Sequence, residues 1–336
     1  MTNKTYEKLK RFIKENYKFI ILLIGLFFLL NYKLPYYITT SGGLIDIENR
    51  IEIKNKKEIS GSFNLAYVNE LQATIPTFLI AKFNSDWEIL KEEEITVDDE
   101  KIEDVYTRDA LLLQEANNNA IKLAYNKAGK KLIIKENKVY VAYVDKIADT
   151  TLEVGDQIVK VDELKIATKE QLYEYIRSKD DKTKLTFEVL NDEKSYTRTA
   201  VTLKNEDVTM VGIMISNISE LETDPKIELK FNSSESGSSG GLMMTLAIYN
   251  YLIDDDITKG RKIVGTGTID ELGNVGSIGG VKYKLAGAVK EKADLFLVPF
   301  GENYEEAKKE KEEKNYDIKI VPVKTLDEAI SYLEKN

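Results

Sequence analysis

The chain begins with a long apolar segment and then changes to alternating polar and apolar positions. Phe19 to Leu30, "FIILLIGLFFLL", is an apolar run without interruption. Counted from Tyr17 to about Tyr37, the segment has roughly the 20 residues that span a bilayer as a helix. Residues 44–107 follow with short alternating runs such as "LIDIENRIEI" and "SGSFNLAYV", which predict strands and turns.

Basic residues gather before the apolar segment. They are Lys4, Lys8, Lys10, Arg11, Lys14 and Lys18, set against Glu7 and Glu15. By the positive-inside rule, the N-terminus then lies in the cytoplasm and the rest of the chain outside. A cleaved signal peptide is the alternative, but "ITTSGG" is a poor match to a small-residue cleavage site. We therefore predict a basic tail at 1–16 and a membrane anchor at 17–37.

The middle of the chain predicts one helix and then a small module. Apolar residues recur at helical spacing from Arg108 to about Ala128, and Gly129 is a suitable C-cap. Residues 131–204 predict two strands in "KLIIKENKVYVAYV", a strand, turn and strand in "LEVGDQIVKVDELKI", a helix in "TKEQLYEYIRSK", and two closing strands. This order predicts an independent, mainly β module.

From about residue 205 the pattern changes to alternating strands and helices. "VTMVGIMI", "KIELKF", "KIVGTGTID", "LFLVPF" and "IKIVPV" are typical of strands, and "GGLMMTLAIYNYLI", "VKYKLAGAVKEKA", "NYEEAKKEKEEK" and "TLDEAISYLEK" of helices. The pattern predicts an α/β or α+β domain of about 130 residues.

Composition excludes several kinds of chemistry. The 336 residues carry a net charge of −9, which argues against a broad nucleic-acid surface. There is no cysteine and no histidine, so a thiol nucleophile and a Ser-His-Asp triad are excluded. Any general base must be Lys, Asp, Glu or Tyr. No G-x-x-x-x-G-K-[ST] phosphate loop is present, and we expect no cofactor and no metal.

A serine-rich loop stands before the predicted helix at 241–253. Its "GSSGG", residues 237–241, formally matches G-x-S-x-G, but the nucleophile elbow of α/β-hydrolases needs a histidine. A lysine base remains available, because "GSIGGVKYKLAGA" supplies Lys282 and Lys284. Burial in an apolar pocket favours the neutral lysine that can accept a proton.

The spacing within the second block separates its two lysines. If Val281, Leu285 and Ala288 face the core, Lys284 lies close to that face while Lys282 points elsewhere. A serine near the start of the 241–253 helix meets a favourable dipole, and free backbone N–H groups there can stabilise an oxyanion.

The module at 131–204 resembles a PDZ domain. The most specific segment is Leu152 to Ile158, "LEVGDQI", which matches the L-x-x-G-D-x-I of that family, and the helix at Lys169–Ser178 follows where the family has one. The resemblance implies binding of an extended peptide by strand addition, with the carboxylate loop near "ENKVYV".

The segment 205–336 resembles the proteolytic domain of the Lon family, a Ser/Lys-dyad peptidase. The family's G-P-S-A-G motif places the nucleophile at Ser239, and its T-G-x-I…G-x-V…I-G-G-x-K-x-K block implies Lys284 as the catalytic lysine with Thr266 hydrogen-bonded to it. Ser238 stands where the family has proline, and Gly240 where it has alanine. The backbone N–H groups from Gly237 to Gly240 are then expected to form the oxyanion hole.

The order of segments resembles the bacterial membrane-anchored PDZ–Lon peptidases of the YlbL and SepM type. The implied fold is multidomain: one N-terminal transmembrane helix, a β-rich region at 38–130, a mainly β PDZ-like domain at 131–204 and an α+β Lon-type proteolytic domain at 205–336. The implied activity is ATP-independent cleavage of exported peptides or unfolded proteins, and the processing of secreted signalling peptides is one expected form of it. The resemblance also implies that the catalytic domain is extracellular.

Two hypotheses follow from these patterns. The first is a membrane-anchored serine endopeptidase, with peptide or unfolded-protein substrates and self-association into a homo-oligomer. The second is a non-catalytic adaptor, in which the PDZ-like domain binds peptides and the Lon-like domain is a degenerate scaffold. An esterase or lipase is disfavoured, because the chain has no histidine.

Overall fold

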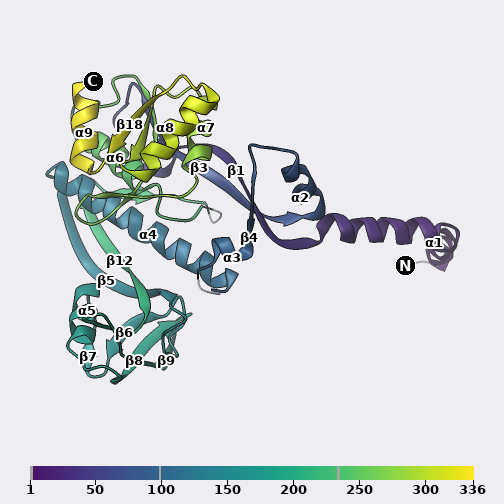
Figure 1. The fold of residues 1–336 in the computed structure, drawn as a ribbon, viewed down its shortest axis with the longest axis horizontal. Helices are drawn as coiled ribbons and strands as arrows, with labels where there is room; N and C mark the ends of the chain where they lie inside the picture. Colours follow the sequence, from purple (N-terminus) through teal and green to yellow (C-terminus); the bar gives the residue numbers. More distant parts are fainter. Residues whose placement is uncertain (1–2, 98–99, 233–234) are drawn as a thin grey trace. The chain divides into compact units, whose positions relative to one another are not determined.

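The computed structural model describes residues 3–97, 100–232 and 235–336. It divides into two compact units (Figure 1). The first comprises Met1–Ser41 and Asn69–Ile95, and the second comprises Gly42–Val68 and Thr96–Asn336.

The first unit holds one long helix and a small antiparallel pair of strands. Its elements are α1 (Asn3–Asn31), β1 (Lys33–Asp46, which continues into the second unit), α2 (Ile75–Lys82), β4 (Glu88–Lys91) and α3 (Glu92–Ile95). β1 pairs with β4 from Tyr36 opposite Lys91 to Thr39 opposite Glu88. Ile38, Ala73 and Ala81 form a small core, against which Phe78 and Trp87 pack.

The predicted membrane span at 17–37 is not supported by this structure. α1 ends at Asn31 and β1 begins at Lys33, so the last part of the predicted span is strand. The apolar run at 19–30 is about 18 Å long as a helix, whereas a hydrocarbon core is about 30 Å thick. Of the helices in the described part of the chain, none is long and apolar enough to cross a membrane.

A six-stranded antiparallel sheet and one helix make up the middle of the second unit. The sheet runs in the order β12-β5-β6-β8-β9, with β7 paired to β6. Its elements are β5 (Lys131–Val144), β6 (Gln157–Val161), β7 (Leu164–Lys165), α5 (Lys169–Arg177), β8 (Lys184–Asn191), β9 (Lys194–Val201) and β12 (Ile213–Asp224). Ile158, Leu172 and Phe187 belong to a core of its own, distinct from the other clusters of buried residues.

Local sequence explains much of this module. Thr168 caps α5, its side chain accepting a hydrogen bond from the Gln171 N–H. Gly155 adopts φ +92°, which favours glycine, in the turn before β6. The segment predicted as two strands in 131–144 is one long strand, because β12 pairs with it along its whole length.

The C-terminal part is a parallel sheet with helices on both faces. β14 (Lys262–Gly265) pairs in parallel with β17 (Leu295–Pro299) and with the start of β3 (Ser62–Thr74), and β17 pairs in parallel with β18 (Lys319–Val323). Alternate residues of β17 join different cores: Leu295 and Leu297 one, Phe296 and Val298 the other. This arrangement is typical of parallel sheets, which are buried on both faces.

Helices cover both faces of this parallel sheet. α6 (Gly241–Leu252) and α9 (Leu326–Lys335) contribute to the core that contains Leu295 and Leu297. α7 (Val281–Lys290) and α8 (Glu302–Lys314) contribute to the core that contains Phe296 and Val298. The small elements are η1 (Ile47–Arg50), the pair β2 (Ile51–Ile53) and β13 (Ile227–Leu229), the pair β10 (Leu203–Asn205) and β11 (Val208–Met210), and the pair β15 (Thr268–Ile269) and β16 (Val275–Gly276).

One long helix, α4 (Ile102–Lys127), contacts both α6 and the strands β5 and β12. It begins six residues before the predicted start at Arg108. Gly129 adopts φ +64° after its end, and the Lys130 N–H donates to the Tyr125 carbonyl at 2.9 Å. This geometry is a Schellman C-cap, as the glycine predicted.

Candidate active site

Lys284 is a buried lysine on α7. Gly280 precedes the helix in a left-handed conformation, with φ +66°, and Val281, Leu285 and Ala288 lie in the core. Lys284 is 4% exposed, and burial lowers its pKa from the usual 10.5 to about 8. Lys282 is half-buried on another side of the helix, with its Nζ 4.8 Å from the centre of the Tyr283 ring.

Thr266 connects this lysine to the serine-rich loop. It is fully buried after β14, where its N–H donates to the Leu297 carbonyl at 3.1 Å. Lys284 Nζ donates to Thr266 Oγ1 at 3.3 Å, and Thr266 Oγ1 donates to the Ser239 carbonyl at 3.1 Å. The structure therefore brings Lys284, Thr266 and Ser239 together through one shared hydroxyl.

Ser239 lies in the turn that leads into α6. The Gly267 N–H donates to its carbonyl at 2.8 Å, which adds a second bond to the one from Thr266. The Ser239 side chain is half-buried. Within the described residues, Ser239 Oγ makes no hydrogen bond, and Lys284 Nζ bonds to Thr266 rather than to this hydroxyl. The backbone of the predicted nucleophile is thus fixed, while its hydroxyl is unbound.

The backbone N–H groups expected to form an oxyanion hole differ in their partners. Gly237 adopts φ +83°, and its N–H donates at 3.0 Å to the Asp109 carbonyl of α4, so it is already engaged. The N–H groups of Ser238, Ser239 and Gly240 have no acceptor among the described residues. We therefore restrict the predicted oxyanion hole to these three donors.

Close packing explains the glycines at the start of α6. A Cβ added at Gly240 would lie 2.8 Å from Leu65 Cδ2, and one at Gly241 would lie 2.8 Å from Ile269 Cγ2 and 3.1 Å from its backbone nitrogen. Leu65 can move its side-chain end, whereas Ile269 N cannot yield. Gly241 is thus required by backbone packing, and Gly240 is favoured by the contact with Leu65.

Two distant residues hold the serine-rich loop, Arg50 and Asp109, and the sequence did not predict either contact. Glu235 forms an ion pair with Arg50, and the Asn232 N–H donates to its carboxylate at 3.1 Å. Asp109 supplies the carbonyl that accepts from Gly237. Both partners lie more than 100 residues before the loop, and no local motif indicates such pairings.

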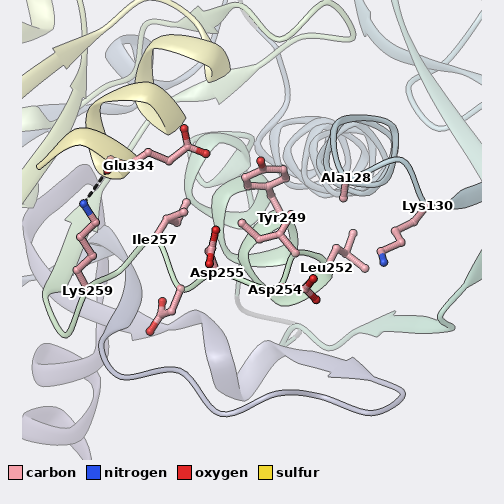
Figure 2. A pocket seen from close by; sticks show the side chains of 11 residues that line it. Ala128, Lys130, Tyr249, Leu252, Asp254, Asp255, Ile257, Lys259 and Glu334 are labelled. Carbon is pink, nitrogen blue, oxygen red and sulfur yellow. Dashed lines mark hydrogen bonds between the residues drawn. The ribbon is translucent and has the colours of Figure 1, made fainter.

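A cavity of about 790 Å³ lies at the opposite end of α6 from Ser239 (Figure 2). Tyr249, Leu252, Asp254, Lys259 and Glu334 are among the residues that line it, and Lys259 Nζ donates to the Glu334 carbonyl at 2.7 Å. None of the predicted site residues borders this cavity. Among the described residues, no group of three or more acidic side chains is arranged to hold a metal ion.

Family models match two separate parts of the chain. The model of the Lon protease (S16) C-terminal proteolytic domain matches residues 232–335, and the PDZ domain model matches residues 126–201. The chain has the domains of a PDZ–Lon-like peptidase. The Lon-type domain contains Ser239, Thr266 and Lys284, and a Lon proteolytic domain is a serine peptidase domain.

Solved structures are similar to part of the chain. The PDZ domain of the SdrC-like protein from Listeria monocytogenes is 21% identical, with 23% of this chain and 85% of that chain covered and a TM-score of 0.22. A solution structure from Geobacillus thermodenitrificans is 25% identical, with 23% and 94% covered and a TM-score of 0.21. Among curated proteins, none matches this chain significantly.

The prediction that the carboxylate-binding loop lies near "ENKVYV" is wrong. These residues lie inside β5, which pairs with β12 on one side and with β6 on the other. The edge strands of the PDZ sheet are β12 and β9. β12 contacts α4, because Ser216 Oγ donates to Glu115 Oε2 at 2.9 Å and lies 3.3 Å from the Leu111 carbonyl.

Charged residues join the PDZ domain to the Lon-type domain. Lys169, at the start of α5, forms ion pairs with Glu271 at 3.1 Å and with Glu115 of α4 at 3.8 Å. Glu271 lies in the turn between β15 and β16, within the segment that connects Thr266 to Lys284. The sequence offered no signal for these contacts beyond the presence of charge.

Proposed function

We propose that the protein is an ATP-independent serine endopeptidase with Ser239 as nucleophile and Lys284 as general base. The observation that carries this proposal is the burial of Lys284, which lowers its pKa to about 8 beside a threonine that also holds the Ser239 backbone. A lysine with this pKa has a usable neutral fraction near neutral pH, as a general base requires.

The proposed reaction has two stages. Ser239 Oγ attacks the carbonyl carbon of the scissile peptide bond while neutral Lys284 Nζ takes the hydroxyl proton, and the free N–H groups near Ser239 receive the oxyanion. Lys284 then returns that proton to the departing amine. In the second stage, Lys284 takes a proton from water and the hydroxide adds to the acyl carbon. The ester bond to Ser239 Oγ then breaks, the acid product leaves, and Lys284 returns the proton to Ser239 Oγ. Both stages require Ser239 Oγ to reach Lys284 Nζ when substrate is bound.

The proposed substrates are peptides or unfolded protein segments, including secreted signalling peptides. A PDZ domain and a peptidase domain on one chain both act on extended peptide, which supports this class of substrate. The proposed independence from ATP is supported by the lack of a phosphate-loop motif in the sequence. We also propose self-association, which light scattering of the purified protein at several concentrations tests.

Cleavage of unfolded casein tests the catalytic proposal. Ser239→Ala and Lys284→Ala should each abolish cleavage while leaving the circular dichroism spectrum unchanged. Lys282→Ala is the matched control, since it removes a lysine two residues away on the same helix, and it should retain activity. Undiminished cleavage by the Ser239→Ala protein would refute the assignment of the nucleophile.

One observation favours the alternative of a non-catalytic adaptor. The hydrogen bond expected between Ser239 Oγ and Lys284 Nζ is not formed among the described residues. An adaptor would bind unfolded casein without cleaving it, and Ser239→Ala would leave its affinity unchanged. Cleavage by the wild-type protein that is lost in Ser239→Ala excludes this alternative.

We further propose that the N-terminal segment attaches the protein to the cell membrane. The apolar side chains of residues 19–30 are largely exposed on α1, and basic residues precede them. Membrane fractionation of cells tests attachment. Digestion of intact cells with added protease tests the predicted orientation, in which the N-terminus is cytoplasmic and the catalytic domain extracellular.

A further inference from the structure

The helix α2 presents an apolar face that the protein leaves uncovered. Its inner side packs on the small core of the first unit through Phe78 and Ala81. On its outer side, Leu79 is 52% exposed, Ile80 is 53% exposed and Phe83, just after the helix, is 90% exposed. These three residues are spaced i, i+1 and i+4, so they gather on one face. We call them the outer face of α2.

The helix α1, which contacts α2, carries a second exposed apolar surface. α1 and α2 belong to the same compact unit and are in contact, and Figure 1 shows α2 beside the C-terminal end of α1. On α1, Phe19, Leu22 and Phe28 are all exposed, and the apolar run at 19–30 surrounds the helix. A protein groove covers one side of a helix, whereas a helix that is apolar on all sides requires an apolar medium such as lipid.

A lysine borders the outer face of α2. Residues 71–85 contain no acidic residue and one lysine, Lys82, which lies at the end of the helix. The Lys82 side chain is exposed and its Nζ lies 5.0 Å from the centre of the Phe78 ring. An apolar face bordered by a lysine is the arrangement of helices that lie in the membrane interface.

We propose that the outer face of α2 inserts into the interfacial layer of a lipid bilayer beside α1. The first unit is then a membrane-bound platform with two apolar contacts, α1 and α2. The inference rests on the proposed attachment through α1 and adds a second contact, made by residues far along the chain from the first. It also specifies the orientation of the unit, because α2 must face the same lipid layer as residues 19–30.

The single tryptophan of the chain makes a direct test possible, because Trp87→Phe removes the intrinsic signal. In that background, Phe83→Trp places a fluorophore on the outer face of α2. The matched control is Phe300→Trp, which replaces another exposed phenylalanine, 55% exposed, in the Lon-type domain. Each full-length protein is mixed with phosphatidylcholine–phosphatidylglycerol vesicles that carry a bromine quencher on their acyl chains.

The expected result is strong quenching for the Phe83→Trp protein and weak quenching for the Phe300→Trp protein. In vesicle flotation, the double variant Leu79→Ser, Phe83→Ser should bind on the order of 100-fold more weakly than wild type, because two large apolar side chains no longer enter lipid. Both residues are exposed, so its melting curve should match that of wild type.

Two other outcomes are distinguishable. If wild-type protein floats with vesicles but the two tryptophan variants are quenched equally and the double variant binds as wild type does, α2 is not a lipid contact and this inference fails alone. If wild-type protein does not float, the proposed attachment itself fails, and this inference fails with it. Loss of self-association in the double variant without any quenching would assign the outer face of α2 to a second copy of the chain and would also overturn the inference.

Discussion

Replacing Lys284 with methionine should stabilise the protein at neutral pH and lose that effect at high pH. Lys284 is 4% exposed, and burial lowers its pKa from 10.5 to about 8. Methionine has a similar length and no charge to bury. It also removes the hydrogen bond to Thr266, which contributes about 1 kcal/mol.

The magnitude follows from the difference between the two pKa values. A shift of one pKa unit corresponds to about 1.4 kcal/mol, so the difference between 10.5 and about 8 is worth about 3 kcal/mol. The unfolded chain binds the extra proton more tightly than the folded chain. Below pH 8, burial of the charged lysine therefore lowers the free energy of unfolding of the wild type by the full amount. As the pH rises from about 8 to 10.5, this destabilisation disappears.

Urea denaturation followed by circular dichroism at pH 7, 9 and 10.5 measures this dependence. At pH 7 we expect the Lys284→Met protein to be about 2 kcal/mol more stable than wild type, which is the burial cost less the lost hydrogen bond. By pH 10.5 the advantage should be gone. Lys282→Met, which alters a half-buried lysine on the same helix, is the control. A stability difference between Lys284→Met and wild type that stays constant with pH would refute the argument.

Three further predictions concern the same site. The kcat/KM for peptide cleavage should rise with pH through a midpoint near 8, because the base must be neutral; a flat profile from pH 6.5 to 9 would contradict Lys284 as the base. Thr266→Val removes the hydroxyl that joins the lysine to the Ser239 carbonyl, so kcat should fall roughly 10- to 100-fold with KM little changed, and Thr266→Ser should restore activity; equal losses in both variants would count against the hydroxyl. Gly241→Ala places a Cβ 2.8 Å from Ile269 Cγ2 and should lower stability by about 1–3 kcal/mol in thermal melts, whereas Gly279→Ala, with open space around its Cβ, should not; equal melting temperatures would contradict the packing argument.

Short-range patterns predicted the elements that carry the site. The helix that holds Lys284 follows from its apolar spacing, which also distinguishes this lysine from Lys282. The hydrogen bond between Thr266 and Lys284 was expected from the family resemblance, because the motif blocks place those residue types at matching positions. The second hydrogen bond of Thr266, to the Ser239 carbonyl, was not predicted. Whether Ser239 Oγ bonds to Lys284 Nζ could not be predicted, because a sequence motif does not specify side-chain conformations.

Long-range pairings were not predictable from the sequence. The start of β3 joins the parallel sheet beside β14, about 200 residues later in the chain, and alternation alone does not identify the partner of a strand. The end of α1 at Asn31 is another case. Apolar composition favoured a longer helix, but residues 33–46 form a strand, and β1 pairs with β4 at Tyr36 to Thr39. Tertiary pairing there overrides the local signal.

The helix α4 couples two distant parts of the second unit mechanically. Its Asp109 carbonyl accepts from Gly237 in the loop before Ser239, and less than two helical turns later Glu115 accepts from Ser216 of β12. An α-helix is rigid over this length, so β12 and the loop before Ser239 are bonded to neighbouring positions of one rigid element. A displacement of the PDZ edge strand must therefore move the nucleophile loop as well, or break one of these two hydrogen bonds.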